Sequence, residues 1–511
     1  MLSECSDQMA AYLKTDTNTL RNYVGGQWID AGGDGVQEVR NPATDEVIAR
    51  TPLSGPDDVD AAVSAAQAAF PSWRATPPVE RARYFFKLRQ LLEEHRDELA
   101  RMIVTEMGKT LEDGRGEVQR GIDNVETACG IPSMMMGYGL EDGAARGIDE
   151  EVVYQPLGVC AAITPFNFPF MIAFWFWPYA VATGNTFILK PSEQDPSVQA
   201  RVFELIEEAG FPPGVMNLVN GGKDAVKALL DHPRIKAISF VGSTQTAQYV
   251  YGRASASGKR VQASGGAKNA IVVMPDANID AYLSTIMNSF YGAAGQRCLA
   301  NSLVLPVGSA HAETRSQVAE AAGKLRLGDG LEPGTDLGPV VSAAARDRIV
   351  AAIENGVAEG ATPVLDGRNA SVPDRPRGYF VGPTLLDGVR PGMRVYQEEI
   401  FGPVVAMSPV ESLDQAIAQI NAAEFGNAAS IFTESGAAAR KFRYEVETGN
   451  IGINVGVAAP VSNFPFSGAK RSFFGSLHPQ GKDAVRFFTE SKVVITRWTT
   501  GDRGPVSGVG R

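Results

Sequence analysis

Cysteine is scarce in this 511-residue sequence: there are four, Cys5, Cys129, Cys160 and Cys298, and no two of them form a CxxC motif. A secreted disulfide scaffold needs cysteines at high density, and a structural zinc site needs closely spaced Cys and His ligands. The sequence therefore argues against both kinds of protein and predicts no metal site. Scattered cysteines are typical of a reducing compartment, so a cytoplasmic location is expected.

The sequence also has no excess of basic residues, because it contains 47 Lys and Arg against 58 Asp and Glu, which gives a net charge of −11. A nucleic-acid-binding protein usually needs a basic face, so no nucleic-acid partner is expected. The N-terminal segment contains Glu4 and Asp7 and no long apolar run, which does not fit a secretory signal. Residues 152–189 carry no charge, but prolines interrupt them, and a spanning helix would leave backbone groups unsatisfied in hydrocarbon. We interpret this stretch as buried core, and no membrane association is expected.

Strand and helix patterns alternate through the first half of the chain, which is long enough overall for roughly two to four domains. Short strands are expected within 22–51, helices at 57–70, 79–107 and 117–126, and a strand at 149–154. The following strands are expected at 158–163, 186–189, 215–219 and 237–241, and the helices at 168–181 (broken by Pro178), 198–209, 225–231 and 244 to about 255. Such alternation predicts an α/β fold with a parallel sheet covered on both faces, whose ligands bind at the carboxyl ends of the strands.

A second α/β unit is predicted to begin at residue 269. Its strands are expected at 269–274, 304–307, 362–365, 404–408, 430–432 and 451–454, and its helices at 281–292, 339–360 and 412–421. Pro363 cannot donate a hydrogen bond to a ladder, so its strand is expected at an edge of the sheet.

Cys298 lies in a small, glycine-bearing segment, FYGAAGQRCLA, directly after Arg297. A thiolate at this position could attack a carbonyl carbon. We expect the neighbouring guanidinium and backbone N–H groups to lower the pKa of the thiol. The alternative is an ordinary buried cysteine, since free cysteines are among the most buried residues.

Polar residues follow three of the predicted strands, although no GxGxxG fingerprint is present. Asn167 follows the first strand, Lys190 and Glu193 follow the second, and Ser243 opens a helix after the fourth. Helix N-terminal amides suit a pyrophosphate, and a carboxylate on the ribose hydroxyls favours NAD over NADP. Each residue alone also has an ordinary interpretation: Glu193 as solvated surface, Ser243 as a helix N-cap and Asn167 as a turn residue.

Six short sequence fragments occur in this order along the chain: TPFNFPF, LKPSEQ, FVGS, GQRC, EEIFGPV and FPFSG. With them the chain resembles the aldehyde dehydrogenase superfamily from Asn22 to about Trp498. Three further fragments, GAKNAIVVMPDAN, GAAGQRC and KRSFFG, are similar to its CoA-acylating methylmalonate-semialdehyde dehydrogenase subfamily. The resemblance implies two doubly wound parallel-sheet domains and a small β oligomerisation flap. The implied ranges are 1–140 and 158–270 for NAD binding, 271–460 for catalysis, 141–157 and 480–498 for oligomerisation strands, and 499–511 for a tail.

The resemblance also implies roles for individual residues. Cys298 would be the nucleophile, and Asn167 with the Cys298 N–H would form the oxyanion hole, a role that suits preorganised donors. Arg120 and Arg297 would bind the substrate carboxylate, which a forked guanidinium recognises well. The implied NAD-binding residues are Thr164, Phe166, Lys190, Glu193, Gln194, Ser243, Gly265, Glu399 and Phe401.

The implied reaction is the NAD-dependent oxidation of methylmalonate or malonate semialdehyde to propionyl-CoA or acetyl-CoA, with loss of CO2 and with CoA as co-substrate. The implied assembly is a homotetramer of paired dimers. Which semialdehyde is preferred, and where CoA docks, stay open.

Ser264 is the informative departure, because hydrolytic family members carry a glutamate there and the acylating subfamily usually carries an asparagine. A lone hydroxyl is a poor base, so attack by water should lose general-base help, whereas a thiol needs less. The rival hypotheses are a hydrolytic semialdehyde dehydrogenase that releases a free acid and a non-catalytic binding or structural protein that keeps the fold. A cysteine hydrolase is disfavoured, since none of the four histidines lies in a partner motif.

Overall fold

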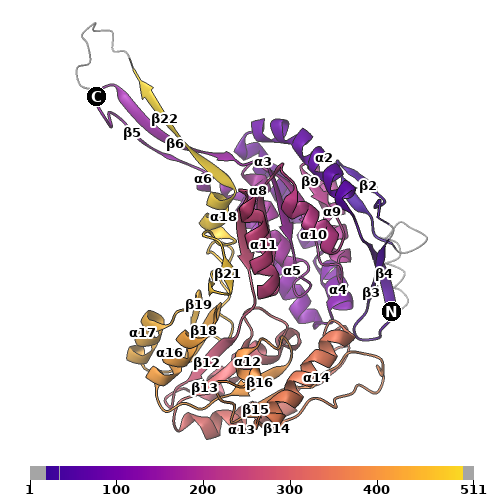
Figure 1. Cartoon of the computed structure of the whole chain (residues 1–511), viewed down its shortest axis with the longest axis vertical. Coiled ribbons are helices and arrows are strands. Elements are labelled where there is room, and N and C mark those ends of the chain that lie inside the picture. Colours follow the sequence, from indigo (N-terminus) through magenta and orange to yellow (C-terminus); the bar gives the residue numbers. More distant parts are fainter. Residues whose placement is uncertain (1–18, 34, 499–511) are drawn as a thin grey trace.

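The computed structural model describes residues 19–33 and 35–498 as two sheets with helices around them and a projecting arm (Figure 1). The predicted tail at 499–511 and residues 1–18 of the predicted NAD-binding range lie outside the described residues.

The first sheet has eight strands in the order β2-β1-β9-β8-β7-β10-β11-β21. Their bounds are β1 Asn22–Val24, β2 Gln27–Ile29, β7 Val159–Ile163, β8 Thr186–Lys190, β9 Met216–Leu218, β10 Ile235–Val241, β11 Arg260–Ser264 and β21 Phe473–Phe474. The five central strands are parallel and almost entirely buried, whereas β1, β2 and β21 are antiparallel additions at the edges. The predicted doubly wound sheet is therefore confirmed, with antiparallel edges that the pattern did not predict.

The second sheet has seven strands in the order β14-β15-β16-β13-β12-β18-β19. Their bounds are β12 Asn269–Val273, β13 Asn301–Pro306, β14 Thr362–Leu365, β15 Thr384–Asp387, β16 Val404–Met407, β18 Ala428–Phe432 and β19 Asn450–Ile453. Only β14 is antiparallel, and it lies at the edge, as Pro363 predicted. Strand β15 was not predicted.

Helices cover the sheets. Around the first sheet they are α2 Pro56–Ala75, α3 Pro78–Glu94, α4 Arg96–Met107, α5 Leu111–Cys129, α6 Ile131–Met134, α7 Met171–Phe174, α8 Trp177–Ala182, α9 Ser197–Ala209, α10 Lys223–Asp231, α11 Thr244–Ala256 and α18 Gly481–Phe487. Around the second they are α12 Ile279–Tyr291, the 3-10 turn η1 Gly292–Gly295, α13 Ala310–Gly323, α14 Ala343–Ala358, α15 Arg394–Gln397, α16 Leu413–Ala422 and α17 Gly436–Glu445.

Three short sheets complete the fold. The arm consists of β22 Thr489–Arg497, β6 Ile148–Pro156 and β5 Tyr138–Leu140, and it extends away from the body (Figure 1). The other two pair β3 Val36–Arg40 with β4 Val47–Pro52, and β17 Phe425–Gly426 with β20 Ala469–Lys470. Within the range 480–498, predicted as strand, residues 481–487 are helix α18, so that part of the prediction is wrong.

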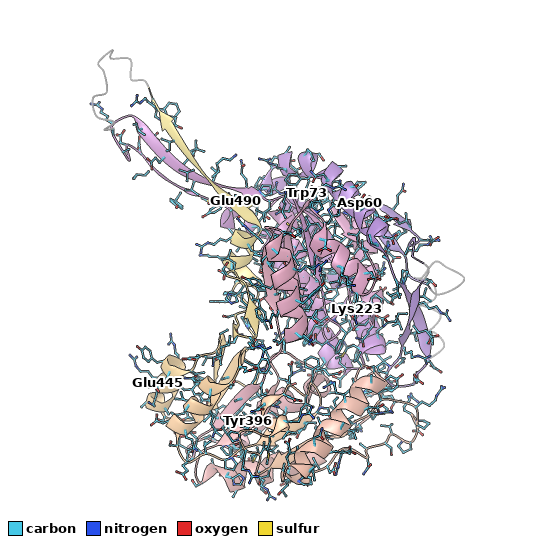
Figure 2. The ribbon with its side chains drawn as sticks, viewed as in Figure 1. Asp60, Trp73, Lys223, Tyr396, Glu445 and Glu490 are labelled. Atoms are coloured by element: carbon cyan, nitrogen blue, oxygen red, sulfur yellow. The ribbon has the colours of Figure 1, made fainter. Side chains whose placement is uncertain are left out.

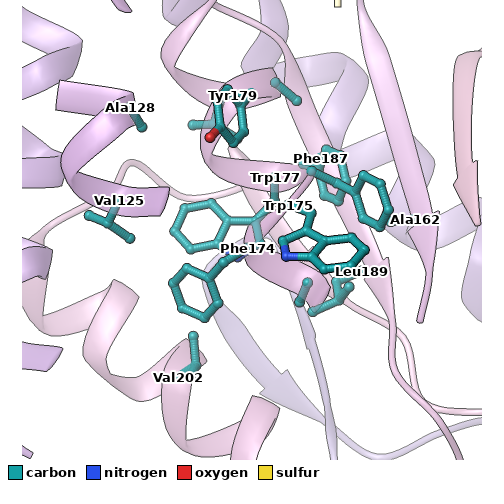
Figure 3. Packing of buried hydrophobic residues seen from close by; sticks show 14 of the residues in the cluster. Val125, Ala128, Ala162, Phe174, Trp175, Trp177, Tyr179, Phe187, Leu189 and Val202 are labelled. Carbon is teal, nitrogen blue, oxygen red and sulfur yellow. The ribbon is translucent and has the colours of Figure 1, made fainter. Parts of the chain in front are cut away.

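Residues 158–189 of the uncharged stretch lie in the buried aromatic core of the first domain, as predicted, whereas residues 152–156 belong to strand β6 of the arm and are half-buried. Helices α7 and α8 pack between β8 and α5, with the Phe174 and Trp177 rings 5.1 Å apart (Figure 3). No helix among residues 19–33 and 35–498 is both long and apolar enough to cross a bilayer. The predicted break at Pro178 is misplaced: the chain leaves helical geometry at Phe176 (φ −120°), and Pro178 lies in the first turn of α8, where its missing N–H is not needed.

The polar surface contrasts with this core. Charged side chains such as Asp60, Lys223, Glu445 and Glu490 extend outward from the ribbon (Figure 2). Trp73 instead is buried under α2, and its indole N–H donates to the carbonyl of Val181 on α8 at 2.9 Å. The outer helix α2 is thereby attached to the aromatic core.

Candidate active site

The carboxyl ends of four adjacent strands, β8, β7, β10 and β11, carry most residues predicted to bind a dinucleotide. The chain runs outward from β7 to β8 and β9 on one side and returns to β10 and β11 on the other, so β7 and β10 flank a topological switch point. After β7, the Thr164 hydroxyl is buried and has no hydrogen-bond partner among the described residues. At the end of β8, the Lys190 ammonium contacts a Glu193 carboxylate oxygen at 3.1 Å. Gln194 follows, with its N–H bound to the Ser192 hydroxyl.

The N-terminus of α11 opens at the same edge. Ser243 caps the helix, because its hydroxyl accepts from the Thr246 N–H. Gly265 and Gly266 bring the backbone close beside it: a Cβ on Gly265 would lie 2.8 Å from the Arg471 carbonyl oxygen. A helix N-terminus next to a side-chain-free turn leaves room for a phosphate to reach backbone N–H groups.

Glu399 faces this edge from the second domain. A Cβ on Gly266 would lie 2.4 Å from a Glu399 carboxylate oxygen, so the carboxylate lies directly against this glycine. Burial raises the pKa of Glu399 to about 7, although Lys268 and Arg348 oppose the shift. The Lys268 ammonium is buried, no residue in the described part of the chain forms a hydrogen bond with it, and burial lowers its pKa to about 8. This buried pair of opposite charges is available to a polar ligand.

Phe166 and Phe401 meet across the two domains. Their rings contact edge to face with centroids 5.9 Å apart. Phe401 has a left-handed backbone (φ 54°), which turns the chain directly after Glu399 and Ile400. The structure thus brings every residue predicted for the NAD site to one edge of the first sheet or to the wall facing it.

The segment before Cys298 is a left-handed turn. Ala293, Ala294 and Gly295 have φ values of 49°, 53° and 69°. A left-handed alanine costs about 1 kcal/mol, so the surrounding structure has to stabilise this turn. A Cβ on Gly295 would lie 2.1 Å from the Gly402 carbonyl oxygen, which packs the turn against the loop that follows Glu399.

The peptide of Cys298 is fixed on its other side by two amides. The Cys298 carbonyl accepts hydrogen bonds from the side chains of Asn269 and Asn427, each at 2.8 Å. Asn269 ends the GGAKN motif and Asn427 begins the segment that leads into β18. Sequence reasoning missed both, because Asn427 is 129 residues from Cys298 and no local pattern connects them.

The Cys298 thiol does not have the lowered pKa that was expected. Burial, and then the negative charge of Glu399, raise its pKa to about 12. The N–H groups of Cys298 and Leu299 and the guanidinium of Arg120 act in the opposite direction but do not prevail. The expectation that Arg297 lowers the pKa is wrong, because the structure pairs that guanidinium elsewhere.

The Arg297 guanidinium is held by two residues beside the cavity, Asp113 and Asn288. Its Nη2 lies 2.5 Å from the Asp113 carboxylate, and its Nη1 donates to the backbone and side-chain oxygens of Asn288. Asp113 also accepts the Ala293 N–H at 3.1 Å. A Cβ on Gly292 would lie 2.5 Å from three guanidinium atoms, so the Arg297 guanidinium lies directly against this glycine. Asp113 and Arg297 therefore stabilise the left-handed turn.

Asn167 connects the first domain to the cysteine turn. Its side-chain N–H donates to the Gln296 carbonyl at 3.0 Å, two residues before Cys298. The backbone carbonyl of Asn167 accepts a hydrogen bond from the Lys109 ammonium at 2.8 Å, and Lys109 is paired with Glu117 at 2.6 Å. Sequence reasoning missed Lys109 and Glu117, since a Lys and a Glu eight residues apart show no motif until the fold brings them to Asn167.

A cavity of about 210 Å³ opens beside the thiol. Cys298, Arg120, Arg297, Asp123 and Asn124 are among its lining residues. The Arg120 side chain is exposed to this space and has no salt bridge within the described part of the chain. The two predicted carboxylate-binding arginines thus share one cavity with the predicted nucleophile, but only Arg120 has an unoccupied guanidinium.

Ser264 ends β11 at the same edge and is 5% exposed. Its carbonyl accepts the Gly242 N–H at 3.1 Å. Its hydroxyl makes no hydrogen bond to any residue that the structure describes. The position predicted to decide between water and thiol therefore holds a neutral hydroxyl with no protein base attached to it.

Comparison with known proteins gives consistent matches over nearly the whole chain. The model of the aldehyde dehydrogenase family matches residues 28–494. Malonate-semialdehyde dehydrogenase 3 of Geobacillus kaustophilus (strain HTA426) is 49% identical over 484 residues, which cover 95% of this chain and 100% of that protein.

Solved structures give the same picture. The methylmalonate-semialdehyde dehydrogenase of Oceanimonas doudoroffii is similar with a TM-score of 0.92 and 46% identity, over 94% of this chain and 99% of that one. A Sinorhizobium meliloti 1021 protein, assigned as a methylmalonate-semialdehyde dehydrogenase and solved with NAD, has a TM-score of 0.93 and 42% identity, over 95% of this chain and 99% of that one.

Proposed function

The chain belongs to the aldehyde dehydrogenase family, and from this premise we propose that it oxidises malonate or methylmalonate semialdehyde with NAD and passes the acyl group to CoA. One observation carries the proposal: a single small cavity holds the Cys298 thiol and the unpaired guanidinium of Arg120. The first can attack an aldehyde carbon, and the second can bind a carboxylate on the same short molecule. The names of the relatives point to the same substrates.

NAD fits the residues present. The unpartnered Thr164 hydroxyl, the Lys190–Glu193 pair and the Ser243 helix terminus line the switch point, and Glu399 faces them. Glu193 and Glu399 suit ribose hydroxyls, and the α11 N-terminus suits the pyrophosphate. When bound there, NAD supplies the acceptor for the hydride that leaves the substrate carbon.

Covalent catalysis starts at Cys298. Its sulfur adds to the aldehyde carbon, and the proton of the thiol is lost as the C–S bond forms. The oxygen becomes an alkoxide that the Asn167 amide and the Cys298 N–H stabilise, and such donors are typically worth about 3–4 kcal/mol each. Loss of hydride leaves a thioester on Cys298. The proton of the thiol passes to solvent water.

Arg120 determines which aldehydes are used. A carboxylate one carbon from the aldehyde can form a charge-assisted pair with its guanidinium while the aldehyde lies at Cys298. Arg297 lines the same cavity and completes a positive wall, although Asp113 shares its charge. Asp123 and Asn124 add polar groups to the lining, and most of the remaining wall is apolar.

The thioester is resolved by CoA. The carboxylate carbon is lost as CO2, its bonding electrons pass to the α-carbon, and that carbon takes up a proton. The CoA thiol then displaces Cys298 sulfur at the acyl carbon and leaves as acetyl-CoA or propionyl-CoA. Ser264 supports this route, because water would lack the carboxylate base that a thiol nucleophile does not need.

The arm supports a homotetramer of paired dimers. It carries large apolar side chains in the open: Tyr138 is 72% exposed, Val493 62% and Ile495 66%. A projecting sheet with an apolar face is an unstable surface for a monomer, and a second copy would cover it. Size-exclusion chromatography with light scattering measures this directly, and a monomer would contradict the proposal.

The test of function is NADH formation from malonate semialdehyde with and without CoA, with the acyl product identified by mass spectrometry. The proposal expects CoA-dependent turnover and acetyl-CoA. Equally fast turnover without CoA, with release of a free acid, would replace it by hydrolytic semialdehyde oxidation. No NADH from any aldehyde would leave a non-catalytic protein with the same fold.

A further inference from the structure

A fully buried ion pair lies behind the predicted oxyanion donor. The Lys109 ammonium and the Glu117 carboxylate are 2.6 Å apart, and both side chains are completely inaccessible to solvent. Lys109 is in the turn before α5, and Glu117 is in the second turn of that helix. Neither contacts the cavity next to Cys298, so the reaction as described above does not use them.

Every polar group of the pair is directed at one segment, residues 167–171. Lys109 donates to the Asn167 carbonyl at 2.8 Å and lies 4.2 Å from the centre of the Phe168 ring. The second Glu117 oxygen accepts the N–H groups of Phe170 and Met171 at 2.8 and 3.0 Å. The pair therefore holds both ends of a segment that has little regular structure of its own.

Helix α5 is shaped to receive this segment. A Cβ on Gly121, one turn after Glu117, would lie 2.2 Å from the Phe170 ring, so glycine leaves the space that Phe170 fills. The segment is thus bound to α5 by both hydrogen bonds and ring packing.

The lysine end of the pair is itself immobilised by the second domain. A Cβ on Gly330 would lie 1.9 Å from the Lys109 carbonyl oxygen, and a Cβ on Gly338 would lie 1.9 Å from the Gly108 carbonyl oxygen. The Gly330 carbonyl also accepts the Leu111 N–H at 3.0 Å. Lys109 therefore connects the domain that carries Cys298 with the segment that carries Asn167.

We propose that Lys109 and Glu117 are positioning residues that set the distance between the Asn167 amide and the Cys298 turn. Buried ion pairs seldom stabilise a fold more than apolar residues of the same size, so stability alone gives little reason for one here. A shift of about 1 Å in a catalytic donor is enough to slow a reaction by roughly a hundredfold. The inference rests on the proposed function only in requiring aldehyde oxidation through Cys298 and Asn167, not any particular aldehyde.

The decisive variant is Lys109→Met/Glu117→Gln. Methionine fills the space of the lysine without its charge, and glutamine keeps an oxygen for the two backbone N–H groups. Both charges of the pair are removed together, and the bond from Lys109 to Asn167 is lost. Glu112→Gln is the matched control, because it makes the same acid-to-amide change on an exposed residue of the same helix.

The readout is the first-turnover burst of NADH from propanal, which reports formation of the thioester before any nucleophile resolves it. The double variant should reduce the burst rate constant at least tenfold, and Asn167→Ala should reduce it by roughly 10²–10³. In the Asn167→Ala background the double variant should change the rate less than twofold, because the pair acts through Asn167. NAD affinity and the rate of Cys298 alkylation by iodoacetamide should stay at the wild-type values.

Additive losses in the Asn167→Ala background would overturn the inference, as would slower alkylation of Cys298, because either would show a general effect on the fold. A wild-type protein that forms no NADH would instead refute the proposed function. If the double variant does not fold, Glu117→Asp, which keeps the charge pair but shortens the carboxylate arm, enters the same cycle with the same criterion of non-additivity.

Discussion

Arg120→Leu should separate carboxylate recognition from aldehyde chemistry. The guanidinium lines the cavity of Cys298 and has no salt bridge within the described residues, so the substrate is free to supply its anion. Desolvation by the surrounding cavity walls, and then the positive charge of Arg297, lower the pKa of Arg120, so an incoming carboxylate relieves an unfavourable environment.

The expected loss follows from that single contact. A hydrogen bond to a charged group is worth about 1.5–3 kcal/mol. At 1.36 kcal/mol per decade, kcat/KM for malonate semialdehyde should fall roughly 10- to 150-fold. Propanal has no carboxylate, so its kcat/KM should change no more than about threefold. That small change would arise from the weak effect of the Arg120 charge on the pKa of the Cys298 thiol.

Initial rates of NADH formation with both aldehydes measure this selectivity. Arg115→Leu is the control, since Arg115 lies on the same helix and only pairs with Asp97 at the surface. Equal losses on both aldehydes would refute the reasoning, because they would show that Arg120 supports the fold or the thiol and not the carboxylate.

Other predictions test the neighbouring groups. Cys298→Ala should abolish NADH formation and leave NAD affinity, measured by calorimetry, nearly unchanged; any remaining wild-type burst would exclude Cys298 as nucleophile. The raised pKa of Cys298 predicts that alkylation by iodoacetamide keeps accelerating up to at least pH 9.5, and that Glu399→Gln accelerates it at pH 8; a plateau near pH 7 would contradict this. Ser264→Glu should raise turnover in the absence of CoA, and unchanged turnover would mean that this position does not select the nucleophile. Asp113→Asn removes the charge that pairs with the guanidinium beneath the cysteine turn and should cost about 1–3 kcal/mol in urea unfolding, whereas unchanged stability would show that the Ala293 hydrogen bond suffices.

Groups at strand ends were predictable because they follow local patterns. Thr164, Lys190, Glu193 and Ser243 each lie at the end of an apolar run or within three residues after it, and parallel strands bring such residues to one edge. The edge position of β14 followed equally well from the missing N–H of Pro363.

Features that depend on packing were not predictable. No residue in GAAGQRC indicates that Ala293 and Ala294 are left-handed, since alanine avoids that region and contacts with residues distant in sequence, such as Asp113 and Gly402, stabilise it there. The thiol pKa was predicted in the wrong direction because the sequence shows neither the burial of Cys298 nor the nearby charge of Glu399. It also does not show that the Asp113 carboxylate pairs with the Arg297 guanidinium.

Helix boundaries failed for a related reason. The sequence predicts that the helix breaks at Pro178, but proline is tolerated in the first turn of a helix. The helix α8 instead begins at Trp177, within a run of buried aromatic residues. The bonds from Lys109 and Asn427 to the active site span 58 and 129 residues, and a single sequence carries no sign of them.

The central claim is that an acyl group is carried on Cys298 until CoA removes it. The most direct test is to mix the enzyme with malonate semialdehyde and NAD in the absence of CoA, quench in acid within the burst phase, and map the modified peptide by mass spectrometry. We predict one acyl group per subunit on the peptide that contains Cys298, which disappears as acetyl-CoA forms when CoA is added before the quench. An unmodified Cys298 after a full burst of NADH, or an acyl group that water removes as fast as CoA does, would contradict the account.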